Sequence, residues 1–180
     1  MSEPQNSALP ALIVDQPLKP LAAYVLPLAE IEGEALPEPY RTLLKHGQHM
    51  TEVLEELNGG PLQLTVIERR LQLSMYSRVI TLSGQARVLE FAVISIDLDK
   101  CPPPVALDIL KEQAPLGRIL INHNVERNLQ VLQFFQVTLI PGNAAFAVDH
   151  PAYTYGRLIA IKINGSTAIE ALELLAPELI

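Results

Sequence analysis

Between Pro61 and Leu175 the sequence is dominated by runs in which apolar and polar side chains alternate. A period of two is typical of a strand, because successive side chains of a strand point to opposite faces of its sheet. Six such runs can be distinguished, at residues 61–73, 77–84, 87–98, 128–140, 155–163 and 166–175. The last two flank Asn164-Gly165, a dipeptide that favours a two-residue hairpin turn. The pattern predicts a six-stranded antiparallel sheet.

Helical patterns lie outside these runs. Residues 39–47 begin with proline and end near glycine, and residues 50–60 carry apolar positions at helical spacing, with Thr51 as the expected N-cap and a double glycine as terminator. Residues 102–124 predict two short helices, one ending near Glu112 and the other following a Pro-Leu-Gly turn. Helices segregated from antiparallel strands indicate an α+β fold with the helices flanking the sheet.

The N-terminal residues 1–39 contain seven of the fifteen prolines. Proline lacks a backbone N–H and fixes φ, so this density excludes a long helix or a central strand. We expect a loosely ordered arm, with one docked apolar piece around residues 22–29. Residues 40–180 are then expected to form the folded domain.

The composition of the chain limits the kinds of partner that it can bind and the compartment in which it is expected. The chain of 180 residues fits one domain, and its net charge of −7 without a basic stripe argues against nucleic acid and anionic membranes. Its apolar runs are too short for membrane insertion, and its N-terminus lacks the pattern of a signal peptide. The single cysteine, Cys101, agrees with a reducing compartment, so we expect a cytoplasmic protein. The sequence leaves the oligomeric state open, with a monomer favoured.

The common catalytic motifs are missing from the sequence. It contains no nucleophile elbow, no phosphate-binding glycine loop and no zinc-protease motif. His46 and His49 have a spacing that metals sometimes use, but Gly47 interrupts the helix that would aim them together. We therefore interpret the two histidines as solvated surface residues and predict no metal site.

Arg78 is the most informative polar residue. Strand alternation places it on one face with Tyr76, Ile80 and Leu82. A guanidinium stays charged when it is buried, so it must meet an anion, water or the edge of the sheet. Two interpretations stay open: an internal salt bridge to Glu68 or Glu90, or a ligand carboxylate bound in an apolar pocket.

The last predicted strand supplies two carboxylates, Glu170 and Glu173. Because they are three residues apart, alternation places them on opposite faces, and at most one can share a cavity with Arg78. A fixed cation and a desolvated carboxylate in one apolar cavity would suit a small polar aromatic or alicyclic acid.

The order and spacing of several segments resemble the chorismate pyruvate-lyase (4-hydroxybenzoate synthetase) family, in its divergent branch. These segments are HMTEVLEELNGGPLQL, SRVITLSG, VLEFAVISIDL, APLGRIL and YGRLIAIKINGSTAIEALELLAPEL, within residues 40–180. The resemblance implies a six-stranded antiparallel sheet with packed helices and an internal ligand cavity closed by helical flaps.

The resemblance also implies site residues. Arg78 and Glu173 would be catalytic and would bind the polar groups of the ligand, the glutamate being selected by its distance from Pro177. Met50 and Leu116 would contribute main-chain contacts to the substrate.

The implied reaction is a carbon–oxygen lyase reaction that eliminates pyruvate from chorismate and leaves 4-hydroxybenzoate, a precursor for ubiquinone or plastoquinone biosynthesis. It requires no cofactor, because aromatisation supplies much of the driving force and the protein mainly holds the substrate in a dry site. Arg118 or Arg157 could bind the second carboxylate of chorismate, or each could form an ordinary surface ion pair.

The alternative is a protein of the same fold that binds or senses a small aromatic acid without converting it, related to the effector domains of GntR-type regulators. The proline-rich residues 1–39 are not expected to form a winged helix, which disfavours a DNA-binding regulator. A free-standing binding protein for a hydroxybenzoate stays open.

Overall fold

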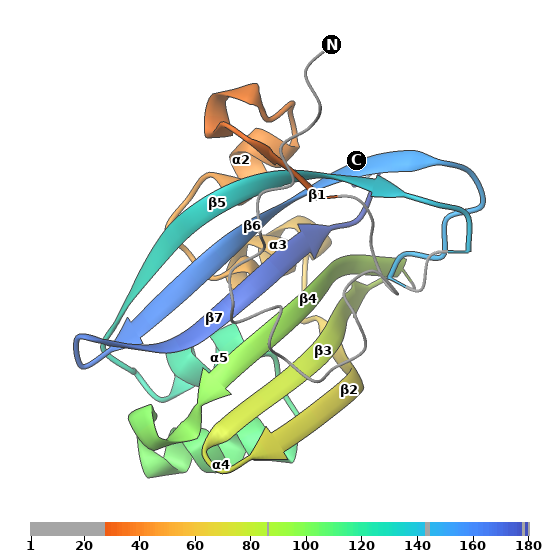
Figure 1. Ribbon diagram of the computed structural model, residues 1–180. Coiled ribbons are helices and arrows are strands. Elements are labelled where there is room, and N and C mark those ends of the chain that lie inside the picture. The colour runs from red at the N-terminus through yellow and green to blue at the C-terminus, as the bar shows by residue number, and fades with distance from the viewer. Residues whose placement is uncertain (1–27, 86, 143–144, 178, 180) are drawn as a thin grey trace.

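The computed structural model of the protein describes residues 28–85, 87–142, 145–177 and 179. One antiparallel sheet has the strand order β1-β5-β6-β7-β4-β3-β2 (Figure 1). Its strands are β1 (Leu28–Ile31), β2 (Gln63–Gln72), β3 (Met75–Gly84), β4 (Arg87–Asp97), β5 (Arg127–Leu139), β6 (Ala152–Ile163) and β7 (Ser166–Leu175). The predicted α+β class is confirmed, with seven strands where the alternation indicated six.

The additional strand, β1, lies in the proline-rich part of the sequence. It pairs with β5 at the edge of the sheet, with Leu28 opposite Val137. Its edge position agrees with the exclusion of a central strand. Leu36, which follows β1, is fully buried. Most of the expected arm, residues 1–27, lies outside the described residues, and so does the expected docked segment 22–29 except for its last two residues.

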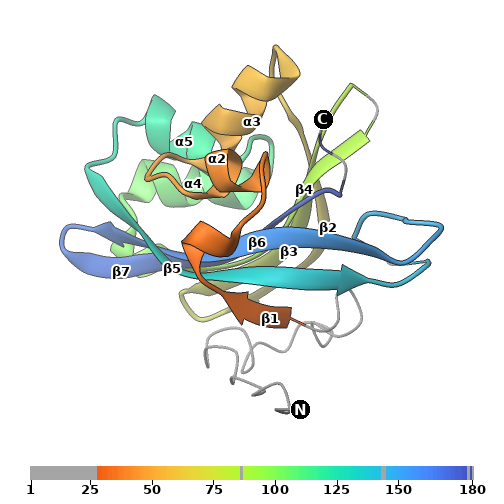
Figure 2. The same ribbon diagram turned by 90° about the horizontal axis from the view of Figure 1, so that it is seen from above.

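The helices are α2 (Tyr40–Leu44), α3 (Met50–Asn58), α4 (Pro103–Lys111) and α5 (Leu116–Asn122), with short 3-10 turns η2 (Gly33–Ala35) and η3 (Leu98–Lys100). These four α-helices of the described residues lie on one face of the sheet (Figure 2). Their predicted positions are confirmed. The N-cap of α3 is His49, however, and Thr51 lies buried inside the first turn. Gly59 ends α3 with φ of 71°, a left-handed conformation that favours glycine.

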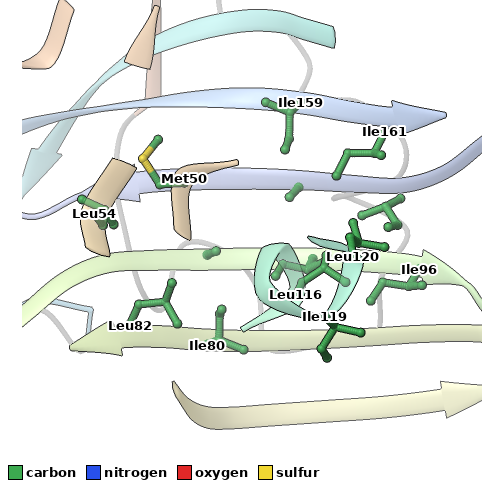
Figure 3. Close-up of a cluster of buried hydrophobic side chains, with 14 of the residues drawn as sticks. Met50, Leu54, Ile80, Leu82, Ile96, Leu116, Ile119, Leu120, Ile159 and Ile161 are labelled. Atoms are coloured by element: carbon green, nitrogen blue, oxygen red, sulfur yellow. The ribbon is translucent and has the colours of Figure 1, made fainter. Parts of the chain in front are cut away.

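Strand alternation builds the core on the helix-covered face. Ile80 and Leu82 of β3 and Ile159 and Ile161 of β6 point toward α3 and α5 (Figure 3). The intervening side chains form a second apolar cluster on the opposite face, where Phe91 packs against Phe146 with ring centroids 6.4 Å apart. The central strands are therefore buried on both sides.

Among the residues that the structure describes, no helix is both long enough and apolar enough to cross a bilayer.

Candidate functional site

A small cavity lies between the helix-covered face of the sheet and helices α3 and α5. Its floor is apolar and includes Ile80, Ile94, Ile159 and Ala171, from β3, β4, β6 and β7. The enclosed space measures about 30 Å³, which is room for about one or two water molecules. The cavity is therefore closed to a ring-sized ligand in this conformation.

The roof of the cavity includes two residues that the resemblance assigned to substrate binding. Met50 opens helix α3 and Leu116 opens helix α5, and both line the cavity. The two helices approach closely at Gly117, where a Cβ atom would stand 2.8 Å from the hydroxyl oxygen of Thr51 and 2.9 Å from Cβ of His49. Glycine in the Pro-Leu-Gly segment is what allows this contact.

Arg78 is completely buried on the same face of the sheet. Ile94, which stands opposite Arg78 on β4, and Ile80, the next residue on the same face of β3, both line the cavity. Arg78 therefore lies directly beside the cavity lining without being part of it. None of its three guanidinium nitrogens has a hydrogen-bond acceptor in the described part of the chain. The internal salt bridge to Glu68 or Glu90 that was considered from the sequence is absent there. Glu90 stands opposite Leu82, four positions along the strand. Glu68 stands opposite Val79, whose side chain lies on the other face of the sheet.

The surroundings of Arg78 do not neutralise its charge. Its guanidinium carbon lies 6.0 Å from the centroid of the Tyr76 ring. The Tyr76 hydroxyl donates to Glu112, whose second carboxylate oxygen accepts from Nη1 of Arg69 at 2.5 Å. Burial lowers the pKa of Arg78, and Tyr76 and Glu112 oppose that shift. The nearby carboxylate of Glu112 is thus already engaged by two other donors.

Glu173 lies in the cavity lining and Glu170 on the other face, as alternation predicts. Glu173 stands opposite Arg157 in the register of β6 and β7, and its Oε2 accepts from Nε of Arg157 at 2.7 Å. Both side chains are almost completely buried, and the exposed fraction of the Arg157 side chain is 0%. The surface ion pair expected for Arg157 is therefore wrong.

Arg157 also holds the loop that leads into α3. Its Nη1 donates to the carbonyl oxygens of Leu44 at 3.0 Å and His46 at 2.9 Å, and its Nη2 donates to that of Gln48 at 3.1 Å. All three guanidinium nitrogens are engaged inside the protein. Arg157 is thus a structural anchor in this conformation, with no free edge for a second ligand carboxylate.

Arg118, the other residue proposed for a second carboxylate, lies on the outer side of α5. Its side chain is 36% exposed and forms an ion pair with Glu55 of α3. It does not line the cavity. The ordinary ion pair that we weighed for Arg118 is the one observed.

Glu90 is a cavity residue whose role the sequence analysis missed. It is 3% exposed, it lines the cavity, and its Oε2 has no hydrogen-bond partner among the described residues. Burial, and then repulsion from Glu173, raise the pKa of Glu90 well above its usual range, while Arg157 opposes the shift. A single acidic residue inside the apolar run from Val88 to Ile96 was the available signal.

The two histidines of the α2–α3 loop are not the solvated surface residues that were expected, since His49 is buried and His46 is half-buried. His49 is 7% exposed and lines the cavity, and its Nε2 accepts from Nε of Arg127 at 2.6 Å. Nε2 of His46 lies 2.7 Å from the carbonyl oxygen of Leu43, to which it donates. Burial is the main cause that lowers the pKa of both histidines, to about 4 for His49. Within the described ranges, no three His, Cys, Asp or Glu side chains gather to hold a metal ion.

Comparison with known proteins identifies the fold. No family model and no curated protein matches the sequence. The gene product SA0254 of Staphylococcus aureus superposes with a TM-score of 0.53 at 6% identity, over 73% of this chain and 90% of that chain. The possible transcriptional regulator YydK of Bacillus subtilis superposes with a TM-score of 0.51 at 9% identity, over 72% of this chain and 64% of that chain.

At such low identities the likeness shows a shared fold and nothing further. This chain spans less than two thirds of the YydK chain. Membership of the chorismate pyruvate-lyase family stays a prediction.

Proposed function

We propose that the protein binds a small aromatic or alicyclic carboxylic acid in a widened form of the cavity beneath α3 and α5. The observation that carries this proposal is Arg78. A buried guanidinium without an acceptor is costly, and a carboxylate that accepts two parallel N–H bonds is its best partner. The apolar floor formed by Ile80, Ile94 and Ile159 would contact the ring.

The polar groups of the site are spaced for a ligand with two polar ends. Arg78 on β3 and Glu173 on β7 are separated by β4 and offset by two positions along the strands. The strand spacing and the rise per residue place their Cα atoms about 12 Å apart. In a widened cavity, side chains rising from the two positions would span one six-membered ring with a polar group at each end.

Binding requires the roof to move, because the present space of about 30 Å³ cannot hold a ring. The roof consists of the first turns of two short helices, α3 with nine residues and α5 with seven. The floor is the centre of the sheet. Separation of α3 from α5 is therefore the smallest change that admits a ligand.

Binding without conversion is the first candidate function. One protein of the same fold is described as a possible transcriptional regulator. In this chain, Glu173 is already neutralised by Arg157, which suits a fixed recognition site.

Calorimetric titration with benzoate, 4-hydroxybenzoate and chorismate tests the proposal. We expect saturable binding by the wild-type protein and its loss in Arg78→Met. Arg70→Met is the matched control, because Arg70 is exposed on the neighbouring strand β2. Equal binding by wild type and Arg78→Met would contradict the proposal.

Conversion of chorismate is the second candidate. The observation in its favour is that the glutamate selected by the family resemblance, Glu173, lies in the cavity, while Glu170 faces away. In this reaction the ether C–O bond of chorismate breaks, the enolpyruvyl group leaves as pyruvate, and loss of a ring proton completes the aromatic ring. Glu173 would meet the ring hydroxyl and assist the movement of the proton.

Pyruvate release from saturating chorismate, in the presence of a chelator, tests this second candidate. We expect Glu173→Gln to lose turnover more than ground-state binding, and Glu170→Gln to retain it. If the protein bound chorismate but released no pyruvate, the second candidate would be contradicted and the first, binding without conversion, would be retained. Activity restored only by a divalent ion would contradict a reaction without metal.

A further inference from the structure

Glu90 occupies the polar end of the cavity. Its neighbours in the sheet are Leu82 on β3 and Leu175 on β7, and Glu173 is two positions away on β7. Diagonal neighbours of this kind have Cα atoms about 7–8 Å apart, within reach of two glutamate side chains. The side chain of Glu90 is buried and lines the cavity, and Oε2 finds no partner in the described ranges.

The charges around Glu90 decide its ionisation. Glu173 from β7 repels a second carboxylate, and Arg157 from β6 is bound directly to Glu173. The α2–α3 loop contributes His49, which burial keeps neutral near pH 7, and α5 contributes the apolar side chain of Leu116. One arginine thus faces two buried carboxyl groups, an arrangement in which one of them retains its proton.

We propose that Glu90 is a neutral carboxylic acid whose O–H donates a hydrogen bond to the second polar group of the ligand, at the end opposite Arg78. This inference rests on the proposed binding function and adds a specificity-determining residue to it. Glu90 and Arg78 lie on adjacent strands four positions apart, with Cα atoms about 14 Å apart. That distance accommodates one ring between two hydrogen-bonded ends.

Glu90 and Glu173 together recognise a hydroxyl group. The oxygen of a ligand hydroxyl accepts from the Glu90 acid, and its hydrogen is donated to the Glu173 carboxylate. An ether oxygen can accept a hydrogen bond from Glu90, but it has no hydrogen to donate to Glu173. An aromatic amine can donate to Glu173, but its nitrogen is a poor acceptor for the O–H of Glu90. An alkyl group satisfies neither carboxyl.

Four para-substituted benzoates separate these roles in calorimetric titration: the hydroxy, methoxy, amino and ethyl compounds. Methoxy and ethyl have nearly the same shape and differ in the acceptor oxygen. We expect Glu90→Leu to bind 4-hydroxybenzoate and 4-methoxybenzoate about tenfold more weakly than the wild type, the effect of one hydrogen bond in a dry site. Its affinities for 4-aminobenzoate and 4-ethylbenzoate should stay within about twofold of the wild type.

Two further variants sharpen the test. Glu90→Gln retains an N–H donor and should retain the preference for methoxy over ethyl. Glu170→Leu removes a carboxyl from the opposite face of β7 and should leave all four affinities unchanged. Leucine fits the apolar surroundings of position 90, and a thermal melt would verify folding.

The outcomes distinguish this inference from the proposed function. If none of the four benzoates binds to the wild-type protein, the proposed function fails, and the inference with it. If the benzoates bind to the wild-type protein, but Glu90→Leu lowers all four affinities equally or leaves all four unchanged, the proposed binding function is retained. Glu90 is then not the hydrogen-bond donor of the cavity.

Discussion

Two arginines on the same sheet face are both completely buried, yet their environments differ. Arg157 donates to Glu173, to the carbonyl oxygen at the end of α2 and to two carbonyl oxygens of the α2–α3 loop. Arg78 has no acceptor among the described residues. Removing a buried charge that is fully bonded leaves its partner uncompensated and destabilises the fold, whereas a buried charge without a partner itself reduces stability. This contrast is the basis for treating Arg157 as a structural residue and for proposing that Arg78 binds a ligand.

Replacing each arginine by methionine tests this contrast. We expect Arg78→Met to raise the free energy of unfolding, by about 1–4 kcal/mol, because it removes a desolvated charge and keeps an apolar side chain. Arg157→Met should lower it by about 3–5 kcal/mol, because Glu173 loses its buried partner. Urea unfolding without ligand measures both, and a large loss of stability in Arg78→Met would return Arg78 to a structural role.

The buried side chain of His49 makes the stability of the folded protein depend on pH. Its pKa is lowered to about 4 in the folded protein, mainly by burial, with Arg127 and Arg157 adding to the shift. The unfolded chain takes up this proton near pH 6.5, so between about pH 6.5 and 4 the unfolded state binds more protons than the folded state. Stability from this residue is complete above pH 6.5 and falls as the pH is lowered.

We expect His49→Gln to remove this dependence, since glutamine does not titrate and its oxygen can accept from Arg127. Between pH 8 and 5 the wild-type protein should lose about 2 kcal/mol of unfolding free energy relative to the variant. Chemical denaturation at both pH values gives the difference. If the wild type and His49→Gln lost the same unfolding free energy between pH 8 and 5, the pKa of His49 would be the same in the folded and the unfolded state.

At the scale of elements, the contact between α3 and α5 controls the cavity. Gly117 permits the close approach, since any Cβ there would meet Thr51 and His49 at less than 3.0 Å. The first turn of α3 is anchored from below by Arg157, through the loop that precedes it. Helix α5 is therefore the element expected to move away when the cavity widens.

A single methyl group at this contact tests the assignment. We expect Gly117→Ala to lower the free energy of unfolding by about 1–3 kcal/mol through overpacking, although alanine is the better helix former. Gly47→Ala is the matched control, because no atom lies within 4 Å of its Cβ position, and it should change stability by less than about 0.5 kcal/mol. Equal stability of both variants would mean that α3 and α5 separate at no cost.

At the scale of the whole molecule, the sheet carries the four buried charged residues of the proposed site, and the helices cover them. Arg78, Glu90, Glu173 and Arg157 all belong to the central strands β3, β4, β7 and β6. The space above them is closed to about 30 Å³. Ligand entry therefore depends on an opening of the helical layer that precedes binding.

The rate of binding should reveal this opening. In stopped-flow fluorescence with 4-aminobenzoate, we expect the observed rate to rise with ligand concentration and then reach a plateau set by the opening step. Gly117→Ala, which separates α3 from α5, should raise the plateau. A rate that increases linearly over the whole concentration range would indicate that the cavity is open in solution.

The local features of this protein follow from its amino-acid pattern alone. The period of two placed six strands and set Glu170 and Glu173 on opposite faces, because side-chain direction in a strand depends only on position along the chain. Proline and glycine marked the ends of the helices, because their backbone restrictions are also local. The α+β class and the burial of Arg78 followed from the same patterns.

Which side chains meet across the sheet depends on strand order and register, and these do not follow from the amino-acid pattern. The register of β6 and β7 placed Arg157 against Glu173, and the register of β4 with its two neighbours placed Glu90 four positions from Arg78 but two positions from Glu173. The tertiary structure also adds β1, from the proline-rich region, to the edge of the sheet, where it pairs with β5. Such pairings join residues far apart along the chain, and alternation gives the face of a side chain without naming its neighbour across the sheet. For that reason the sequence indicated a buried arginine and a buried glutamate, and the fold determined that they have different partners.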